Sequence, residues 1–145
     1  LCDTDDNSVL SQMIQIYNKY QCSIVAIEEV PINQSNKYGI ISGDLVDESN
    51  EIYKVTNMIE KPEPKDSPSN LAIIGRYILT PDIFDILKTI TPDKNNEIQI
   101  TDALLVQAQK GKVIGYKFKG KRFDCGSVKG YVEATNYFAD KVLLK

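Results

Sequence analysis

The sequence has 145 residues, of which 42% are hydrophobic and 26% charged, proportions that exclude a disordered chain, a collagen-like repeat and a coiled coil. Its formal net charge of −3 argues against nucleic-acid binding as the main function, since that requires an excess of clustered lysine and arginine. It contains no histidine, which excludes Ser-His-Asp or Cys-His catalysis and a histidine-ligated zinc site. Any catalysis therefore depends on carboxylates, lysines and backbone amides.

The first half of the chain is predicted to alternate between helix and strand. Apolar residues at helical spacing predict a helix over 8–20, with Asp6 or Asn7 as its cap. Strands are predicted at 22–27, 38–41 and 51–61. Three prolines within 61–68 predict a stiff loop that is neither helix nor central strand.

The second half continues the same pattern. A strand is predicted at 71–79, followed by a helix that 80–82 caps, with Pro81 in its first turn. Thr101 and Asp102 are predicted to cap a helix that runs to Gln109 and ends at Gly111. Strands at 113–118 and 120–124 and a final helix over 128–138 complete one mixed α/β domain, residues 1–145.

Three cysteines are predicted to be reduced thiols of an intracellular protein, because none has the C-x-x-C spacing. They are Cys2, Cys22 and Cys125. The apolar runs are too short to cross a bilayer, and no segment predicts a signal peptide. We therefore expect no membrane association.

The segment Ile59-Glu60-Lys61-Pro62 places a carboxylate beside an ammonium at the end of a predicted strand. Successive strand side chains point to opposite faces, so Glu60 and Lys61 reach one ligand only where the strand bends or ends. In that geometry Glu60 accepts hydrogen bonds from sugar hydroxyls and Lys61 binds a phosphate. A solvated strand end is the alternative interpretation.

Asp124 is followed by Cys125 and Gly126 after a predicted strand. An acid followed by glycine commonly forms a turn. The functional alternative is one carboxylate of a Mg²⁺ site that neutralises phosphates. Gly39, inside a predicted strand, either marks a bulge or allows a ligand to approach the backbone closely.

Two runs of charge accompany these motifs. The basic run comprises Lys117, Lys119, Lys121 and Arg122, and the acidic run comprises Asp3, Asp5 and Asp6. The basic run alternates along a predicted strand, which favours a solvated face over phosphate attraction and, last, nucleic acid. The acidic run favours helix capping over metal binding.

No single motif decides the function, but their order does. The blocks are Glu29-Val30-Pro31, Lys37–Ile40, Ile59–Pro62, Pro68–Tyr77, Asn96–Ala103, Gly120–Gly126 and Gly130-Tyr131. From about residue 8 onward, their order and spacing resemble the bacterial UTP–glucose-1-phosphate uridylyltransferases (UDP-glucose pyrophosphorylases), part of the sugar-nucleotide pyrophosphorylase group. The blocks S-N-L-A-x-x-G-R-Y and E-I-Q-x-T-D-A are the most specific part of this resemblance.

The resemblance implies a reaction and a set of site residues. A phosphate oxygen of glucose 1-phosphate attacks the α-phosphorus of UTP, which releases pyrophosphate and forms UDP-glucose. By the resemblance, Lys61 binds the phosphate of glucose 1-phosphate, Glu60 holds glucose hydroxyls and the backbone of Gly39 contacts the sugar. Ile73 matches backbone contacts to the hexose, and Asp124 matches the second of two aspartates that hold catalytic Mg²⁺.

The sequence also departs from this family. The resemblance implies a glycine-rich, arginine-containing nucleotide loop and a first metal aspartate, and the sequence contains neither. The expected fold is therefore a partial Rossmann-like α/β nucleotidyltransferase fold, a mixed sheet flanked by helices. We expect it to correspond to the C-terminal, sugar-phosphate-binding half of an enzyme and to be inactive alone. At full length the resemblance implies a cytoplasmic homo-oligomer, in which the final helix serves the interface or the core.

Two further interpretations stay open. One is a non-catalytic sugar-phosphate-binding module, favoured by the missing nucleotide loop. The other is a thymidylyl- or adenylyltransferase of the same superfamily, because the half that selects the base is absent here.

Overall fold

The computed structural model describes residues 1–4, 7–93 and 95–143. It consists of two compact units, one formed by residues 12–118 and the other by residues 1–11 together with 119–145. We call them the barrel unit and the terminal unit. None of the helices in the described ranges is long and apolar enough to cross a membrane.

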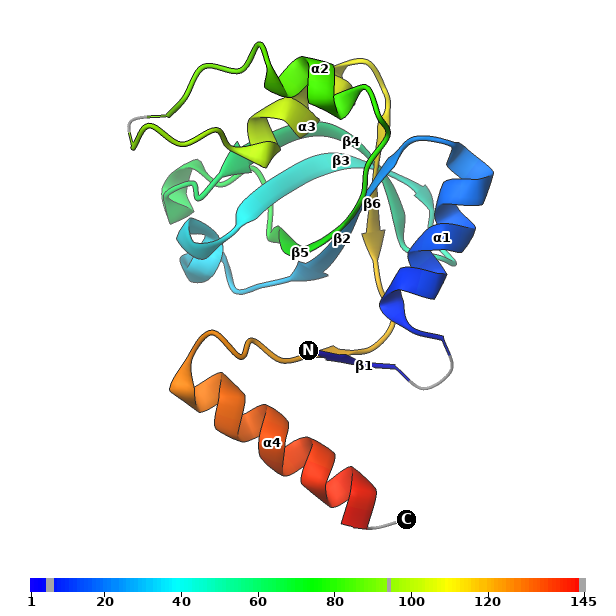
Figure 1. Cartoon of the computed structure of the whole chain (residues 1–145), viewed down its shortest axis with the longest axis vertical. Helices are drawn as coiled ribbons and strands as arrows, with labels where there is room; N and C mark the ends of the chain where they lie inside the picture. Colours follow the sequence, from blue (N-terminus) through cyan, green and yellow to red (C-terminus); the bar gives the residue numbers. More distant parts are fainter. Residues whose placement is uncertain (5–6, 94, 144–145) are drawn as a thin grey trace. The chain divides into compact units, whose positions relative to one another are not determined.

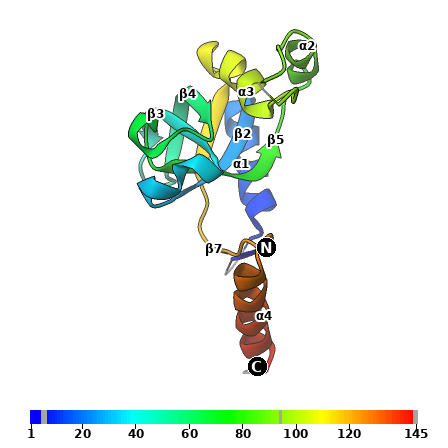
Figure 2. The same cartoon turned by 90° about the vertical axis from the view of Figure 1, so that its left-hand side faces the viewer.

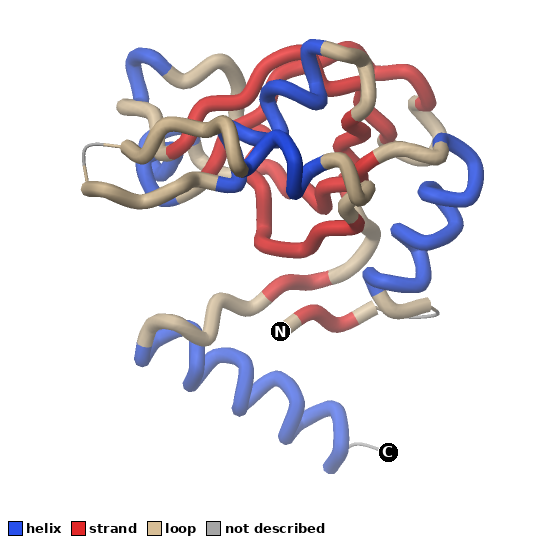
Figure 3. The backbone as a smooth tube through the Cα atoms, turned by 45° about the horizontal axis from the view of Figure 1, so that its top comes forward, coloured by secondary structure: helices blue, strands red, loops and turns tan. Residues whose placement is uncertain are grey.

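The barrel unit is built on five strands that close into a barrel in the order β2-β5-β3-β4-β6 (Figures 1 and 3). The strands are β2 (Ser23–Glu29), β3 (Gly39–Asp47), β4 (Ile52–Glu60), β5 (Leu71–Ile78) and β6 (Val113–Lys117). β2 and β6 pair in parallel and the other neighbours are antiparallel. The expected mixed sheet is therefore present. Because it closes into a barrel, each of its strands is paired on both sides and it has no exposed edge.

Helices and short 3₁₀ turns connect these strands. The helices are α1 (Val9–Tyr20), which begins in the terminal unit, α2 (Ile83–Leu87) and α3 (Ile100–Gln109), and the 3₁₀ turns are η1 (Ile32–Lys37) and η2 (Pro64–Asp66). α3 packs against β4, and α2 packs against α3 (Figure 2). The 3₁₀ turn η2 corrects the prediction that this stiff loop contains no helix, because Pro64 occupies its first turn, where a missing N–H costs little.

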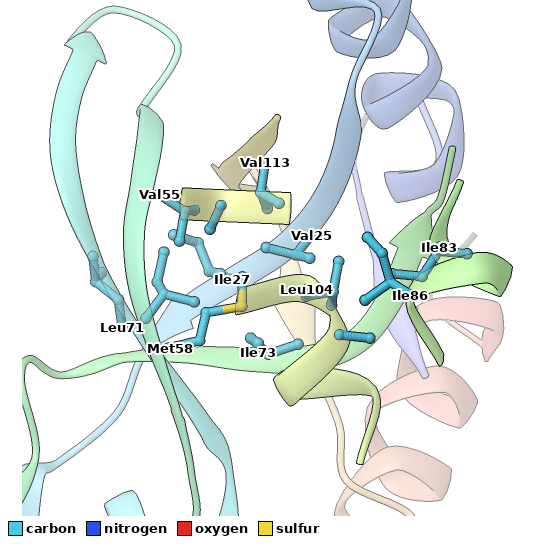
Figure 4. Packing of buried hydrophobic residues seen from close by; sticks show 13 residues of the cluster. Val25, Ile27, Val55, Met58, Leu71, Ile73, Ile83, Ile86, Leu104 and Val113 are labelled. Carbon is cyan, nitrogen blue, oxygen red and sulfur yellow. The ribbon is translucent and has the colours of Figure 1, made fainter. Parts of the chain in front are cut away.

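The core of the barrel unit lies between the strands and α3 (Figure 4). Ile27, Met58, Ile73 and Leu104 are each at most 6% exposed and belong to one apolar cluster. The first five residues of β2 are all buried, as expected for a short apolar strand in the middle of a sheet. This packing fixes the ends of β4 and β5, from which the candidate site is built.

The terminal unit pairs β1 (Cys2–Asp3) with β7 (Lys121–Arg122) and ends in α4 (Val128–Leu143). The rings of Phe123, Tyr137 and Phe138 lie within 5.7 Å of one another, centroid to centroid. These two α4 aromatics therefore pack inside the unit, whereas Tyr131 on the same helix is 62% exposed.

The predicted side-chain caps are absent at α2 and α3, whereas at α1 the prediction of Asp6 or Asn7 stays untested. Ser8 Oγ accepts the Ser11 N–H at 3.2 Å at the start of α1, whereas the predicted cap Asp6 lies outside the described residues. At α2 the Asp82 side chain makes no capping bond, and α3 begins after Gln99 with no side-chain cap. The prediction that α3 ends at Gly111 is confirmed. Gly111 has φ of +70°, and its N–H donates to the Ala108 carbonyl.

The charged runs are also used differently from the prediction. Lys117 lies on β6 and donates to Glu29 at 3.0 Å and Glu51 at 2.7 Å, whereas Lys121 and Arg122 belong to β7 in the other unit. The predicted basic strand face therefore does not exist. Asp3 lies in β1 and accepts from Tyr137 at 2.8 Å and from Lys141, so it caps no helix. Asp5 lies outside the described residues.

Asp47 organises the hairpin between β3 and β4. Its carboxylate accepts hydrogen bonds from Asn50 Nδ2 at 3.0 Å, from Ser49 Oγ at 2.8 Å and from the Asn50 backbone at 3.2 Å. These bonds, with a weaker one from Lys19, lower the pKa of Asp47 to about 2. The charged form of this side chain therefore holds the turn.

All three cysteines, Cys2, Cys22 and Cys125, are free thiols, as predicted. Burial raises the pKa of the Cys22 thiol.

Candidate functional site

The end of β4 carries the acid–base pair that the sequence singled out. β4 ends at Glu60, and Lys61 adopts a left-handed backbone conformation with φ of +46°. This turn breaks the alternation of the strand, and Lys61 Nζ lies 3.8 Å from Glu60 Oε1. The strand end that the sequence analysis required is therefore present, and both side chains reach the same region.

Two hydrogen bonds from the preceding loop hold this turn. The Lys61 N–H donates to the Tyr38 carbonyl at 2.9 Å, and the buried Ser35 Oγ donates to the Pro62 carbonyl at 3.1 Å. A non-glycine residue in the left-handed region costs of the order of 1 kcal/mol, and such strain persists only where the surroundings impose it. The backbone conformation that brings Lys61 beside Glu60 is therefore a strained one that the surrounding hydrogen bonds maintain.

Gly39 lies directly beside Glu60 as its cross-strand partner. A Cβ at this position would come within 3.0 Å of Glu60 Oε2, 3.2 Å of Thr101 Oγ1 and 3.3 Å of Ile73 Cδ1. Residues of β3, β4, β5 and α3 therefore meet at one point, and four of the five predicted site residues (Gly39, Glu60, Lys61 and Ile73) lie in this part of the barrel unit. The absence of a side chain at Gly39 leaves the Glu60 carboxylate room.

Thr101 lies in the candidate site, contrary to its predicted role as a helix cap. Its hydroxyl donates to Glu60 Oε2 at 2.6 Å, and the residue is only 3% exposed. The predicted role as a helix cap is therefore incorrect, because the hydroxyl is already used by a carboxylate on β4. The E-I-Q-x-T-D-A block contained this residue, but no local pattern distinguishes a cap from a long-range contact.

Tyr77 is the second residue that the sequence analysis did not assign. Ile27 pairs with Ile73 and Val25 with Tyr77, so β5 has three residues opposite the single residue Ala26 of β2. Gly75, in the middle of this bulge, has φ of +71°. Burial and the negative charge of Glu60 raise the pKa of Tyr77. The phenol therefore remains neutral at physiological pH and stands within the electrostatic reach of Glu60.

The geometry gives each group a distinct chemical capacity. Thr101 donates to Glu60 Oε2, whereas Glu60 Oε1 lies 3.8 Å from the Lys61 ammonium. The Glu60 side chain is 25% exposed and that of Lys61 59% exposed, so both are accessible to a ligand. A carboxylate oxygen accepts hydroxyl hydrogen bonds and an exposed ammonium attracts a phosphate. This arrangement suits a ligand that carries hydroxyls and a phosphate together.

Asp124, the fifth predicted residue, belongs to the terminal unit. Its Oδ1 accepts the Gly126 N–H at 3.0 Å, and its Oδ2 lies 3.9 Å from Arg122 Nη1. Asp124 and Gly126 therefore form the turn that is one of the two interpretations of this motif. The Asp124 side chain is 60% exposed, so its remaining lone pairs are open to a ligand.

A divalent cation needs several oxygen ligands, and Mg²⁺ prefers six. Across residues 1–4, 7–93 and 95–143, no three carboxylate or thiol side chains are grouped closely enough to hold one. Asp124 can supply one oxygen ligand, but the described residues do not form a complete metal site by themselves.

Comparison with known proteins now defines the family. The sequence profile of the nucleotidyl transferases matches residues 4–141, nearly the whole chain. The chain belongs to the nucleotidyl transferase family. The expected fold class is thereby confirmed.

Within this family, the chain is most usefully compared with individual uridylyltransferases. This nucleotidyl transferase chain is 59% identical over 138 residues to a UTP–glucose-1-phosphate uridylyltransferase of Pseudomonas aeruginosa PAO1. The aligned region covers 94% of this chain and 49% of that protein. A Staphylococcus epidermidis protein of the same name is 39% identical over 136 residues, 94% of the chain and 46% of its own length. The chain thus spans about half the length of the curated relatives it matches, in agreement with the predicted half-enzyme.

Solved structures agree with this assignment. A UDP-glucose pyrophosphorylase complexed with UDP-glucose is 58% identical and superposes with a TM-score of 0.91, covering 97% of this chain and 53% of its own. The UTP-bound enzyme of Acinetobacter baumannii is 32% identical, with a TM-score of 0.81 over 97% of this chain and 48% of its own. The arrangement of elements described above is therefore that of UDP-glucose pyrophosphorylases.

Proposed function

We propose that this chain is the sugar-phosphate-binding half of a UTP–glucose-1-phosphate uridylyltransferase, which converts UTP and glucose 1-phosphate into UDP-glucose and pyrophosphate. The observation that carries the proposal is the convergence of Glu60, Lys61, Gly39 and Thr101 at the end of β4. The similarity to uridylyltransferases supports the choice of reaction.

In this proposal the chain works by positioning and charge. The Lys61 ammonium binds the phosphate of glucose 1-phosphate, while Glu60 accepts hydrogen bonds from glucose hydroxyls through the oxygen that Thr101 leaves free. A phosphate oxygen then forms the new bond to the α-phosphorus of UTP, and the bond to the leaving pyrophosphate breaks. The attacking oxygen already carries charge, so no general base is required, in keeping with a sequence that has no histidine.

Gly39 and Ile73 shape the sugar side of this site. The missing side chain of Gly39 lets a hexose approach the backbone of β3, and Ile73 supplies backbone contacts from the neighbouring strand β5. Asp124 is proposed as one ligand of a Mg²⁺ ion, which would neutralise phosphate charge when bound. Its remaining ligands are proposed to come from outside the described residues.

A chimera tests the proposal. This chain replaces the matching half of the Pseudomonas aeruginosa relative, and UDP-glucose formation from UTP and glucose 1-phosphate is measured with Mg²⁺ present. Lys61→Ala is expected to lower the rate by about 10²–10³, because removing a charge engaged with the transition state costs roughly 3–4 kcal/mol. Lys65→Ala, at an exposed lysine four residues away, is the matched control.

Each outcome has a defined meaning. A loss of less than about threefold in kcat/KM for both substrates would remove Lys61 from the proposed site. Unchanged Mg²⁺ dependence in Asp124→Asn would remove the metal role. Glucose 1-phosphate binding by the 145-residue chain, together with a folded but inactive chimera, would favour the non-catalytic binding module.

The proposed enzyme is cytoplasmic and acts as a homo-oligomer at full length, with neither nucleic acid nor membrane as partner. Free thiols at all three cysteines are in keeping with a reducing compartment. The exposed Tyr131 on α4 is a candidate interface residue. Light scattering of the full-length protein and of a Tyr131→Ser variant tests the oligomer.

A further inference from the structure

A pocket lies in the barrel unit, away from the site of Glu60 and Lys61. It has a volume of about 520 Å³, and ten residues line it. Lys54, one of them, precedes Glu60 by six residues on β4, which corresponds to about 20 Å of extended strand. The pocket also includes Cys22, which lies just before the start of β2. The proposed sugar site lies near the other end of β2, where Ile27 pairs with Ile73. The pocket is therefore a separate feature of the barrel.

A network of buried polar side chains reaches this pocket at Thr80. Ser23 Oγ donates to Gln107 Oε1 at 2.7 Å, and Gln107 Nε2 donates to Thr80 Oγ1 at 3.0 Å. Ser23 and Gln107 are fully buried. Such a network holds its members in fixed positions, since a broken bond would leave a buried polar atom without a partner. It ends at the pocket, which Thr80 and Asp82 line.

Asp82 is the negative group of the pocket. Hydrogen bonds from Thr80 and Gln107, together with the nearby positive charge of Lys112, lower the pKa of Asp82. The carboxylate is therefore ionised and oriented by groups of the protein. It presents an acceptor for hydroxyl groups.

Two lysines supply positive charge. Lys54 and Lys112 both line the pocket, and neither has a carboxylate oxygen within 4.0 Å among the residues that the structure describes. A Cβ at Gly111 would lie 3.7 Å from Lys54 Nζ, so this ammonium stands beside the turn that carries Lys112. The pocket therefore holds two cations and one anion. The other lining side chains include Tyr20, Val46 and Ile114, which offer apolar surface to a ring.

We propose that this pocket binds a phosphate ester carried on a hydroxyl-bearing ring, the chemistry shared by sugar phosphates and nucleotides. Lys54 and Lys112 bind the phosphate, Asp82 accepts a ring hydroxyl, and the ring packs against the apolar wall. The inference does not depend on the proposed uridylyltransferase activity. It assigns the chain a second ligand site, at the other end of the barrel.

The test is an NMR titration of the ¹⁵N-labelled 145-residue chain. The probes are glucose 6-phosphate, UMP, inorganic phosphate and glucose, each to about 10 mM. We expect saturable shifts of the Gly111 and Lys112 amides with one or both phosphate esters, weaker binding of inorganic phosphate, and no shift with glucose. Glucose 6-phosphate and UMP distinguish a sugar-phosphate ligand from a nucleotide.

Variants separate this pocket from the proposed sugar site. The double variant Lys54→Gln/Lys112→Gln is expected to weaken phosphate-ester binding at Gly111 by about tenfold or more. The matched control Lys110→Gln, at a neighbouring exposed lysine outside the pocket, leaves it unchanged. Lys61→Gln alters only the response of the Gly39 amide.

Three results would overturn the proposal. The first is the absence of shifts at Gly111 and Lys112 with both phosphate esters. The second is inorganic phosphate binding as tightly as the esters, which would mean that no ring is recognised. The third is undiminished binding in the double variant while its spectrum shows an intact fold. A missing response at Gly39 alone would count against the proposed sugar site and leave this pocket unaffected.

Discussion

Replacing Thr101 by valine removes the hydroxyl that donates to Glu60 Oε2 at 2.6 Å and keeps the β-branched shape of the side chain. Threonine and valine have similar helix propensities, so α3 itself is hardly affected. The residue is almost completely buried, and the variant therefore leaves one oxygen of the Glu60 carboxylate without its donor. The change tests whether Thr101 positions the carboxylate.

The magnitude follows from the exposure of the acceptor. A hydrogen bond to a charged group contributes about 1.5–3 kcal/mol when buried. The Glu60 side chain is 25% exposed, so water replaces part of the lost bond and the expected loss is about 1–2 kcal/mol. In sugar affinity this corresponds to roughly a tenfold weakening of glucose 1-phosphate binding, because the freed carboxylate no longer holds one orientation.

The shift of the Gly39 amide in an NMR titration of the 145-residue chain measures the effect, because it reports this site and not the pocket of Lys54 and Lys112. Inorganic phosphate is expected to bind Thr101→Val within about twofold of the unmodified chain, since Lys61 and not Glu60 binds the phosphate. Thr101→Ser, which retains the hydroxyl, is the matched control and is expected to keep most of the glucose 1-phosphate affinity. Urea unfolding of each variant checks that the fold is intact.

Two results would refute this reasoning. One is a folded Thr101→Val variant that binds glucose 1-phosphate as tightly as the unmodified chain. The other is equal weakening in the valine and serine variants, which would assign the effect to packing of the methyl group. If the unmodified chain does not bind glucose 1-phosphate at all, the sugar site itself is refuted.

Three further predictions follow from other contacts. Gly39→Ala is expected to weaken glucose 1-phosphate binding by about tenfold, because its Cβ would lie 3.0 Å from Glu60 Oε2 and 3.2 Å from Thr101 Oγ1 and would shift the hydrogen-bonded carboxylate. We expect the stability loss to be about 1 kcal/mol. NMR titration, followed at the amide of residue 39, and urea unfolding measure the two effects. Gly130→Ala is expected to destabilise the terminal unit by about 3 kcal/mol in urea unfolding, because its Cβ would lie 1.9 Å from the Asp124 carbonyl oxygen. Asp47, with its pKa lowered to about 2, stabilises the fold above the ordinary carboxyl pKa of 3.8, and this contribution is lost as the pH falls from about 4 to about 2. The urea midpoint is therefore expected to fall less between pH 5 and pH 2.5 in Asp47→Ala than in the unmodified chain.

Each of these has a contrary outcome. Unchanged sugar affinity in Gly39→Ala would mean that Glu60 does not contact the ligand. A Gly130→Ala variant as stable as Asn136→Ala, an exposed α4 position, would contradict the close packing of α4 on the Asp124 segment. Parallel acid sensitivity with and without Asp47 would show that other carboxylates govern the acid transition.

Local sequence determined most of the elements of this protein. The apolar periodicity of 8–20 and 71–79 matches α1 and β5 within a residue, because such patterns report which face of an element is buried. Gly111 was identifiable as a helix stop because only glycine adopts the left-handed conformation there at little cost. The E-K-P segment also predicted the end of β4, since a proline has no N–H to continue a strand's hydrogen bonds.

Tertiary structure alone decided which groups meet. The Thr101 hydroxyl donates to Glu60, 41 residues earlier, and not to its own helix, and Lys117 pairs with Glu29 and Glu51. These choices depend on the strand order and register of the closed barrel, which set the distance between residues far apart in the chain. Periodicity and turn chemistry report backbone conformation and burial, but a hydrogen-bonding partner is selected only when packing brings one acceptor within about 3 Å.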